Sequence, residues 1–165
     1  MSILRSRKEV ENMRMKKLER DAAFAEEVLK TASYVTLAMI NKDGKPYCVP
    51  INTVWHDGAL YFHCAGEGEK WEILKDGTPV CLTAVTNAHL MPANYDIAYD
   101  CAMVKGRAVV VKDEAERHAA MRHIVAALAP EYLDKLDEHM IRRMDVTKIV
   151  KIVPEEITGK QNSDR

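Results

Sequence analysis

Residues 47–70 constrain the fold most, because they combine a tight hairpin with a glycine-bearing turn. Residues 47–55 are rich in strand-forming types, and Asp57-Gly58 signals a two-residue turn into a second strand at 59–64. The chain then runs through Gly66 and Gly68 to Lys70, where helical apolar spacing begins at 71–74. We therefore expect an antiparallel hairpin followed by a turn whose backbone amides and Lys70 suit a phosphate group.

Further strands are predicted along most of the chain. The run at 34–40 is apolar or β-branched almost throughout, which is typical of a strand with both faces covered. Strands are also predicted at 80–85 and at 102–111, where Gly106 indicates a bulge or a close approach of another chain segment. The alternation at 146–153 predicts a half-exposed strand that closes the sheet.

The connecting segments place the helices outside this sheet. Residues 1–30 form a charged segment that predicts one or two amphipathic helices. Asp113 is expected to cap a helix that ends before Pro130, with a second helical piece over 131–143. The residues of the first of these helices expected to face inward are Ala115, Ala119, Met121, Ile124, Val125 and Leu128.

Residues 87–100 carry several turn-forming residues, so they are predicted to form a loop near the site. Hairpin connections dominate, and no regular strand–helix–strand alternation is present. The sequence therefore predicts a mainly β fold, an antiparallel sheet closed into a small barrel with flanking helices.

Length and charge limit the classes of protein that this chain can belong to. The 165 residues are expected to form a single domain over 1–165, with a flexible tail at 161–165. Lys plus Arg, at 24, nearly cancel Asp plus Glu, at 25, so nucleic acid and anionic lipid are not expected partners. The charged N-terminal residues and the absence of a long apolar run predict a cytoplasmic protein that does not span a membrane.

Cysteine and histidine spacing does not favour a metal site. The four cysteines, Cys48, Cys64, Cys81 and Cys101, form no CxxC pair and lie in strand-like runs, so they are interpreted as buried thiols. His118 and His123 are five residues apart on a predicted helix, whereas metal ligands on one helix face are usually four apart. We expect no metal.

Taken in order, these pieces resemble the FMN-binding split β-barrels related to pyridoxamine 5′-phosphate oxidase, especially the branch similar to nitroimidazole reductases. The resemblance rests on the hairpin with its glycine turn, on GRAVVVKD before a helix, and on the closing VKIVPEEITGK. It covers most of residues 13–160. It implies an antiparallel split β-barrel and a homodimer with FMN in grooves between the two subunits.

The resemblance also implies two groups of cofactor-binding residues. The first group would edge the isoalloxazine ring and comprises Val49, Pro50, Ile51, Asn52 and Thr53. The second would surround the ribityl phosphate and comprises His63, Cys64, Ala65, Gly66 and Lys70. Many relatives have serine in place of Cys64, which would replace a hydroxyl donor with a weaker one.

Simpler interpretations exist for several of these residues. Lys70 suits a solvated helix position as well as a phosphate, and Asn52 and Thr53 suit ordinary strand positions. His63 is the one candidate for direct chemistry, on the same strand face as Tyr61, although a lone strand histidine is more often a packing residue. Trp55 and Trp71 are interpreted as packing residues, and four arginines are interpreted as solvated helix faces: Arg117, Arg122, Arg142 and Arg143.

Three functional hypotheses follow from these observations. In the first, a flavin-dependent oxidoreductase passes electrons from a reduced nicotinamide to a small acceptor such as a nitroaromatic compound or a quinone. In the second, the same barrel holds a flavin or a haem without catalysis, for storage or sensing, with His63 or His89 as a haem ligand. In the third, the chain has lost its cofactor and forms a structural dimer. Small molecules and a second copy of the chain are the expected partners.

Overall fold

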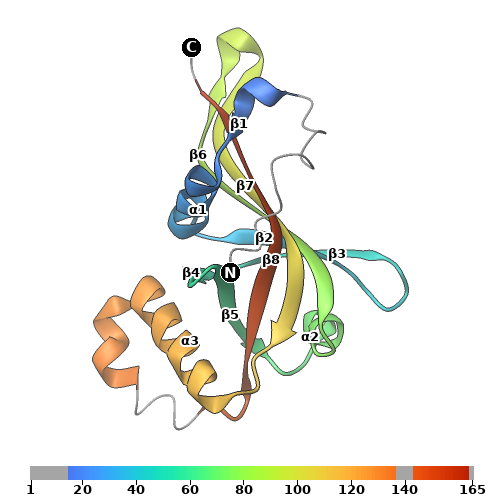
Figure 1. Ribbon diagram of the computed structural model, residues 1–165, viewed down its shortest axis with the longest axis vertical. Coiled ribbons are helices and arrows are strands. Elements are labelled where there is room, and N and C mark those ends of the chain that lie inside the picture. Colours follow the sequence, from blue (N-terminus) through green and yellow to red (C-terminus); the bar gives the residue numbers. More distant parts are fainter. Residues whose placement is uncertain (1–14, 137–142, 164–165) are drawn as a thin grey trace.

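The computed structural model describes residues 15–136 and 143–163, which form an eight-stranded antiparallel sheet with helices on its outside (Figure 1). The strand order is β3-β2-β6-β7-β8-β5-β4, and β1 pairs with β8. The strands are β1 (Glu19–Arg20), β2 (Val35–Ile40), β3 (Pro46–Ile51), β4 (Val54–His56), β5 (Ala59–Ala65), β6 (Thr78–Met91), β7 (Asp96–Val110) and β8 (Thr147–Asn162). All described ladders are antiparallel, which confirms the predicted fold class.

Within the described residues, α-helices and short 3-10 helices connect these strands. The α-helices are α1 (Ala22–Thr31), α2 (Glu69–Leu74) and α3 (Glu114–Leu128). The 3-10 helices are η1 (Lys16–Leu18), η2 (Pro92–Asn94) and η3 (Pro130–Lys135). Residues 1–14 and 137–142 lie outside the described residues, so much of the predicted helical segment at 1–30 and of the helical piece at 131–143 is not described. None of the described helices is long and apolar enough to cross a membrane.

The predicted hairpin turn is present, but its first strand is shorter than expected. Asp57 and Gly58 have φ values of 47° and 74°, as a type I′ turn requires, and they join β4 to β5. Residues 47–55 do not form one strand, because β3 ends at Ile51 and pairs with β2, whereas β4 begins at Val54 and pairs with β5. Asn52 and Thr53 therefore connect the two ends of the strand order.

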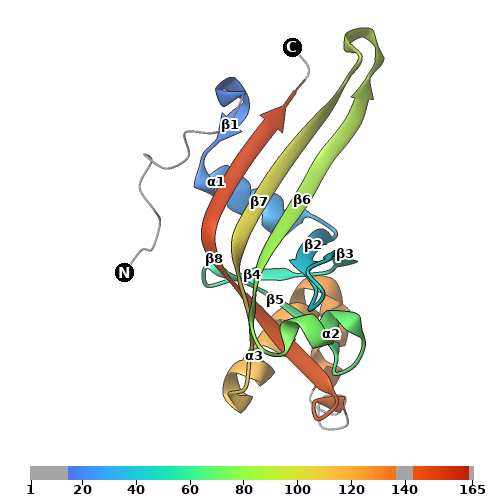
Figure 2. The same cartoon turned by 90° about the vertical axis from the view of Figure 1, so that its right-hand side faces the viewer.

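The main core is formed by buried residues of the sheet together with those of α1 and α2. Strand residues that alternate with outward-facing ones are fully buried, among them Leu37, Leu82, Val104 and Ile152. The helix α1 begins at the N-cap Asp21, whose carboxylate accepts a hydrogen bond of 2.9 Å from the backbone N–H of Phe24. This helix buries Ala25, Val28 and Leu29 against the sheet, which lies beside it in both views (Figure 2).

The helix α3 covers a second, smaller core on β5 and β8. Asp113 caps it as predicted, with a hydrogen bond of 2.8 Å from the Glu116 N–H. The predicted inward face is wrong in part: Ile124 is buried and Met121 and Val125 are half-buried, but Ala115, Ala119 and Leu128 are exposed. At 100° per residue, Ala115 and Ala119 lie on the far side of the helix from Ile124, and the buried alanine is instead Ala120.

Residues 87–100 are not a loop near the site, because most of them belong to the long hairpin of β6 and β7. The turn-forming residues are confined to two places: Asn87, with φ 53°, lies at a register shift, and Pro92 begins η2 at the tip. Between them the strands pair regularly, for example Leu90 with Ile97. The hairpin projects from the end of the sheet opposite α2 (Figures 1 and 2).

The last strand, β8, is also longer than the predicted 146–153. It runs to Asn162, and Gln161 donates a 2.7 Å hydrogen bond to Asp100, so the predicted flexible tail at 161–165 is wrong for residues 161 and 162. Gly106 confirms the predicted close approach, because a Cβ atom there would lie 2.3 Å from the carbonyl oxygen of Val153. The β7–β8 register shifts at the same point.

Candidate functional site

A cavity of about 640 Å³ lies where β5 ends and the chain turns toward α2. One wall is the end of β5 and the glycine turn, and the other is the turn that precedes β8. The lining residues are His63, Cys64, Ala65, Gly66, Glu67, Arg143, Asp145, Val146, Thr147 and Lys148. Four of the five residues predicted to surround a phosphate are therefore gathered in one cavity.

The pairing of β5 with β8 builds this cavity. Cys64 lies opposite Lys148, and Ala65 lies opposite Thr147. Cys64 is buried with Phe62 in the main core, so it acts chiefly as a packing residue whose position also borders the cavity. His63, on the Tyr61 face of the strand, is exposed at the cavity.

Lys148 is the residue that the sequence analysis missed. Its side chain lies across Gly66, so closely that a Cβ atom on Gly66 would be 2.8 Å from Lys148 Cε. Its ammonium group donates a 3.3 Å hydrogen bond to the backbone carbonyl of Asp145 and has no carboxylate partner within the described part of the chain. Only knowledge of the β5–β8 register could have placed this lysine against the glycine turn.

Charges of both signs surround the cavity: Lys70 lies beside it, and its lining includes Arg143, Lys148, Glu67 and Asp145. Burial lowers the pKa of His63, and the positive charge of Lys70 lowers it further, so the imidazole is neutral at pH 7 even though the ring reaches solvent. Burial raises the pKa of the Cys64 thiol, while Lys70 and Lys148 oppose that shift. Both lysines are thus within electrostatic reach of Cys64, one from α2 and the other from β8.

Two carboxylates of α2 bond to other side chains and do not line the cavity. Glu69 accepts a 3.0 Å hydrogen bond from the side-chain amide of Asn41. Glu72 pairs with Lys75 at 2.7 Å and with Lys42 at 3.2 Å, and these two bonds lower its pKa. The turn between β2 and β3 therefore binds the glutamate side chains of α2 through Asn41 and Lys42. Lys70, on the first turn of α2, is half-buried beside the cavity rather than in its lining.

The other predicted group, residues 49–53, lies elsewhere in the single chain. Ile51 is buried in the main core, Val49 is half-buried and Pro50 is exposed. The side-chain amide of Asn52 donates a 2.7 Å hydrogen bond to the carbonyl of Ser33. Thr53 lines a separate cavity of about 280 Å³ with residues of α1 and α3. One chain does not bring the two predicted groups into one cavity.

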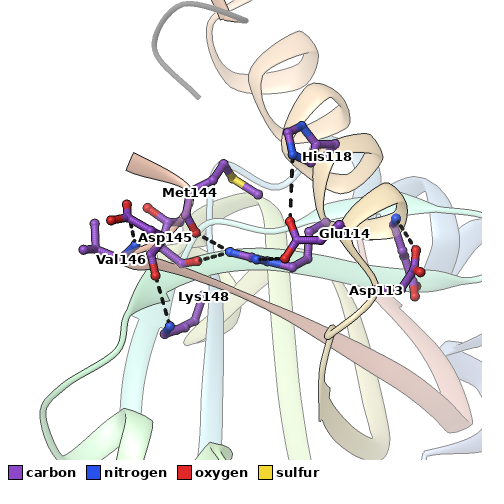
Figure 3. A network of polar contacts seen from close by, with 10 residues as sticks. Asp113, Glu114, His118, Met144, Asp145, Val146 and Lys148 are labelled. Carbon is purple, nitrogen blue, oxygen red and sulfur yellow. Dashed lines mark hydrogen bonds and ion pairs between the residues drawn. The ribbon is translucent and has the colours of Figure 1, made fainter. Parts of the chain in front are cut away.

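The interpretation of Arg117 as a solvated helix residue is wrong. Its side chain is 14% exposed, and its guanidinium group bonds to the turn before β8 (Figure 3). Arg143 is exposed but lines the cavity, Arg122 is exposed on α3, and Arg142 lies outside the described residues. Charge alternation along a helix could not show that one arginine reaches another element.

Other sequence interpretations have mixed outcomes. Trp55 and Trp71 pack against the main core, as predicted. All four cysteines are free, but Cys64 alone among them is buried, and Cys48 is exposed. The ring of His123 stacks on that of His56, with 3.6 Å between the ring centroids.

The comparisons with known proteins agree with this fold. The family described as pyridoxamine 5′-phosphate oxidase matches residues 21–161, which is most of the chain. The chain belongs to the pyridoxamine 5′-phosphate oxidase family. No curated protein matches it.

Several proteins with solved structures share the fold at low sequence identity. A candidate 5-nitroimidazole antibiotic resistance protein from Bacteroides thetaiotaomicron is 22% identical with a TM-score of 0.69, over 86% of this chain and 84% of that one. The flavocytochrome Anf3 from Azotobacter vinelandii is 20% identical with a TM-score of 0.80, over 92% and 72% of the two chains. A FAD and haem binding protein from Mycobacterium smegmatis is 16% identical with a TM-score of 0.77, over 89% and 74%. At these identities the likeness establishes the fold.

Proposed function

We propose that the protein is a flavin-dependent oxidoreductase that passes electrons from a reduced nicotinamide to a small acceptor such as a nitroaromatic compound or a quinone. FMN is the proposed flavin. The observation that carries the proposal is the cavity at the end of β5, where Gly66 meets Lys148 in the segment predicted to hold the ribityl phosphate. Flavin-binding relatives with the same fold support it.

The residues at the cavity fit the phosphate end of a flavin. The absence of a side chain at Gly66 makes room for the stem of Lys148, and Lys148 and Lys70 supply positive charge from two sides. His63 is neutral at the cavity, so it can donate or accept a hydrogen bond without adding charge. A bound flavin would supply the hydride and electron chemistry, and these residues would hold and orient it.

We further propose that a second copy of the chain completes the site, because residues 49–53 and the cavity lie apart in one chain. The outer face of the sheet supports this dimer. The strand β2 was predicted to be covered on both faces, but in the single chain Ala38 is exposed and Ile40 is 58% exposed. Across the pairing register, small or uncharged neighbours continue this face on β3 and β6: Cys48, Pro50, Cys81, Thr83 and Val85. A contiguous uncharged face of this kind is typical of a protein–protein interface.

Replacing Ala38 with arginine is expected to convert the dimer to a monomer, because the new charge would be buried at the centre of this face. Sedimentation should give a dimer mass for the parent protein and a monomer mass for Ala38→Arg, which should also lose flavin. Ala119→Arg, at an exposed position on α3, is the matched control and should remain dimeric. A monomeric parent protein would contradict the proposal.

Absorbance of the purified protein tests the oxidoreductase function. The protein is expected to take up one FMN per chain, to lose the yellow colour when reduced nicotinamide is added without air, and to regain it on addition of a nitroaromatic compound or quinone. Full flavin that is never reduced would favour a non-catalytic flavin-binding protein. A Soret band would favour haem binding, the function that the flavocytochrome fold suggests as the alternative. Absence of any cofactor would leave a structural dimer.

A further inference from the structure

Arg117 joins α3 to the wall of the cavity. Its Nη2 atom donates to two backbone carbonyls of one turn, that of Met144 and that of Thr147, the latter at 3.1 Å (Figure 3). Its Nη1 atom donates to Glu114 at 2.5 Å. The planar guanidinium group is therefore held at one edge by its own helix and at the other by the turn.

The turn held in this way carries Lys148 over Gly66. Within the turn, the Asp145 carboxylate accepts a 2.9 Å hydrogen bond from the Val146 N–H, and the Asp145 carbonyl accepts a 3.3 Å hydrogen bond from Lys148. Since the stem of Lys148 lies against Gly66, a shift of the turn would move the ammonium group away from the glycine turn. Arg117 of α3 therefore contacts the turn, and the turn carries Lys148, which lies at the proposed phosphate position.

The helix α3 has other attachments to the sheet that do not involve Arg117. Ala120 and Ile124 are buried against Tyr61 and Ile149. Glu116 accepts hydrogen bonds from Tyr61 at 3.1 Å and from Lys151 at 3.0 Å. Removing the guanidinium group of Arg117 should therefore free the turn while α3 stays in place.

We propose that Arg117 is a positioning residue for the anionic end of the ligand: it fixes the 144–147 turn so that Lys148 lies over Gly66. The inference rests on the proposed flavin site and extends it to a residue that does not line the cavity. Arg117 touches the turn rather than the ligand. Its effect should therefore fall on the phosphate of FMN and not on the ring system, which riboflavin shares.

The test compares FMN with riboflavin in calorimetric titrations of Arg117→Leu, which keeps an apolar stem, and of Arg117→Lys, which cannot bond both carbonyls with a planar fork. In Arg117→Leu the FMN affinity should fall by about tenfold, the scale of a lost charged hydrogen bond, with riboflavin affinity unchanged. Arg117→Lys should lie between. His118→Ala is the matched control, because His118 contacts Glu114 from the same helix but does not reach the turn, and it should match the parent protein.

Hydrogen exchange of the protein without added ligand gives a second measurement. Amides of residues 144–148 should exchange faster in Arg117→Leu, while those of α2 stay as in the parent protein. The inference is overturned if exchange in the turn is unchanged, or if it rises while the ratio of FMN to riboflavin affinity stays that of the parent. A parent protein that binds neither flavin would instead refute the proposed function, and the exchange result would then decide whether Arg117 fixes the turn.

Discussion

Replacing Lys148 with alanine is expected to weaken FMN binding by about ten- to a hundredfold and to leave riboflavin binding unchanged. The side chain lies over Gly66 and has no carboxylate partner in the described part of the chain, so its charge is available to a ligand. A hydrogen bond to a charged group contributes about 1.5 to 3 kcal/mol, which corresponds to this range of affinity. Riboflavin lacks the phosphate, so its affinity should not change.

The matched control for Lys148→Ala is Lys112→Ala, an exposed lysine that precedes α3 and does not line the cavity. It removes the same charge and should leave both affinities unchanged. Calorimetric titration with the two flavins measures the effect. An equal loss of FMN and riboflavin affinity in Lys148→Ala would mean that the lysine supports the fold of the cavity rather than the phosphate. If Lys112→Ala lost as much FMN affinity as Lys148→Ala, the effect would be explained by long-range charge alone.

The second large effect is expected at Gly106, where alanine should lower the free energy of unfolding by about 3 kcal/mol or more. The added Cβ would lie 2.3 Å from the Val153 carbonyl oxygen and 3.1 Å from the Pro154 Cα, and both are backbone atoms that cannot rotate away. Relief would require β7 and β8 to separate at the register shift between them. The strand β8 also carries Lys148, so this clash should also disturb the cavity that Lys148 lines.

Gly44→Ala is the matched control, because it makes the same chemical change where nothing lies within 4 Å of the added atom. Its φ of +75° should cost about 1 to 2 kcal/mol through backbone strain alone. Denaturant titration of both variants measures the difference. A loss in Gly106→Ala no larger than that in Gly44→Ala would show that β7 and β8 are less closely packed at this point than described.

Local signals in the sequence predicted the local structure well. Asp57-Gly58 predicted its turn because few residue pairs adopt two positive φ values in succession, and Asp113 predicted the start of α3 because its carboxylate caps the helix. The run of apolar and β-branched residues at 34–40 predicted the strand β2, although only one of its faces is buried in the single chain. The prediction for 87–100 failed because Asn87 and Pro92 mark a bulge and a tip, and sequence alone does not separate these from a loop.

Of the two predicted groups of site residues, one is largely gathered at a single cavity. The segment from His63 to Gly66 was found because its chemistry is contiguous in the chain. Lys148 and Arg117 were missed because their roles depend on long-range geometry: the register of β8 against β5 and the reach of a side chain from α3. The predicted contribution of Asn52 and Thr53 stays a prediction, since one chain does not place them at the cavity.

A crystal structure of the protein grown with FMN would test the central claim most directly. We expect the phosphate in the cavity at the end of β5, next to Gly66 and within hydrogen-bond distance of Lys148 Nζ, with Asn52 and Thr53 of a second chain at the ring. A phosphate bound outside the cavity that residues 63–67 and 143–148 line would contradict the account.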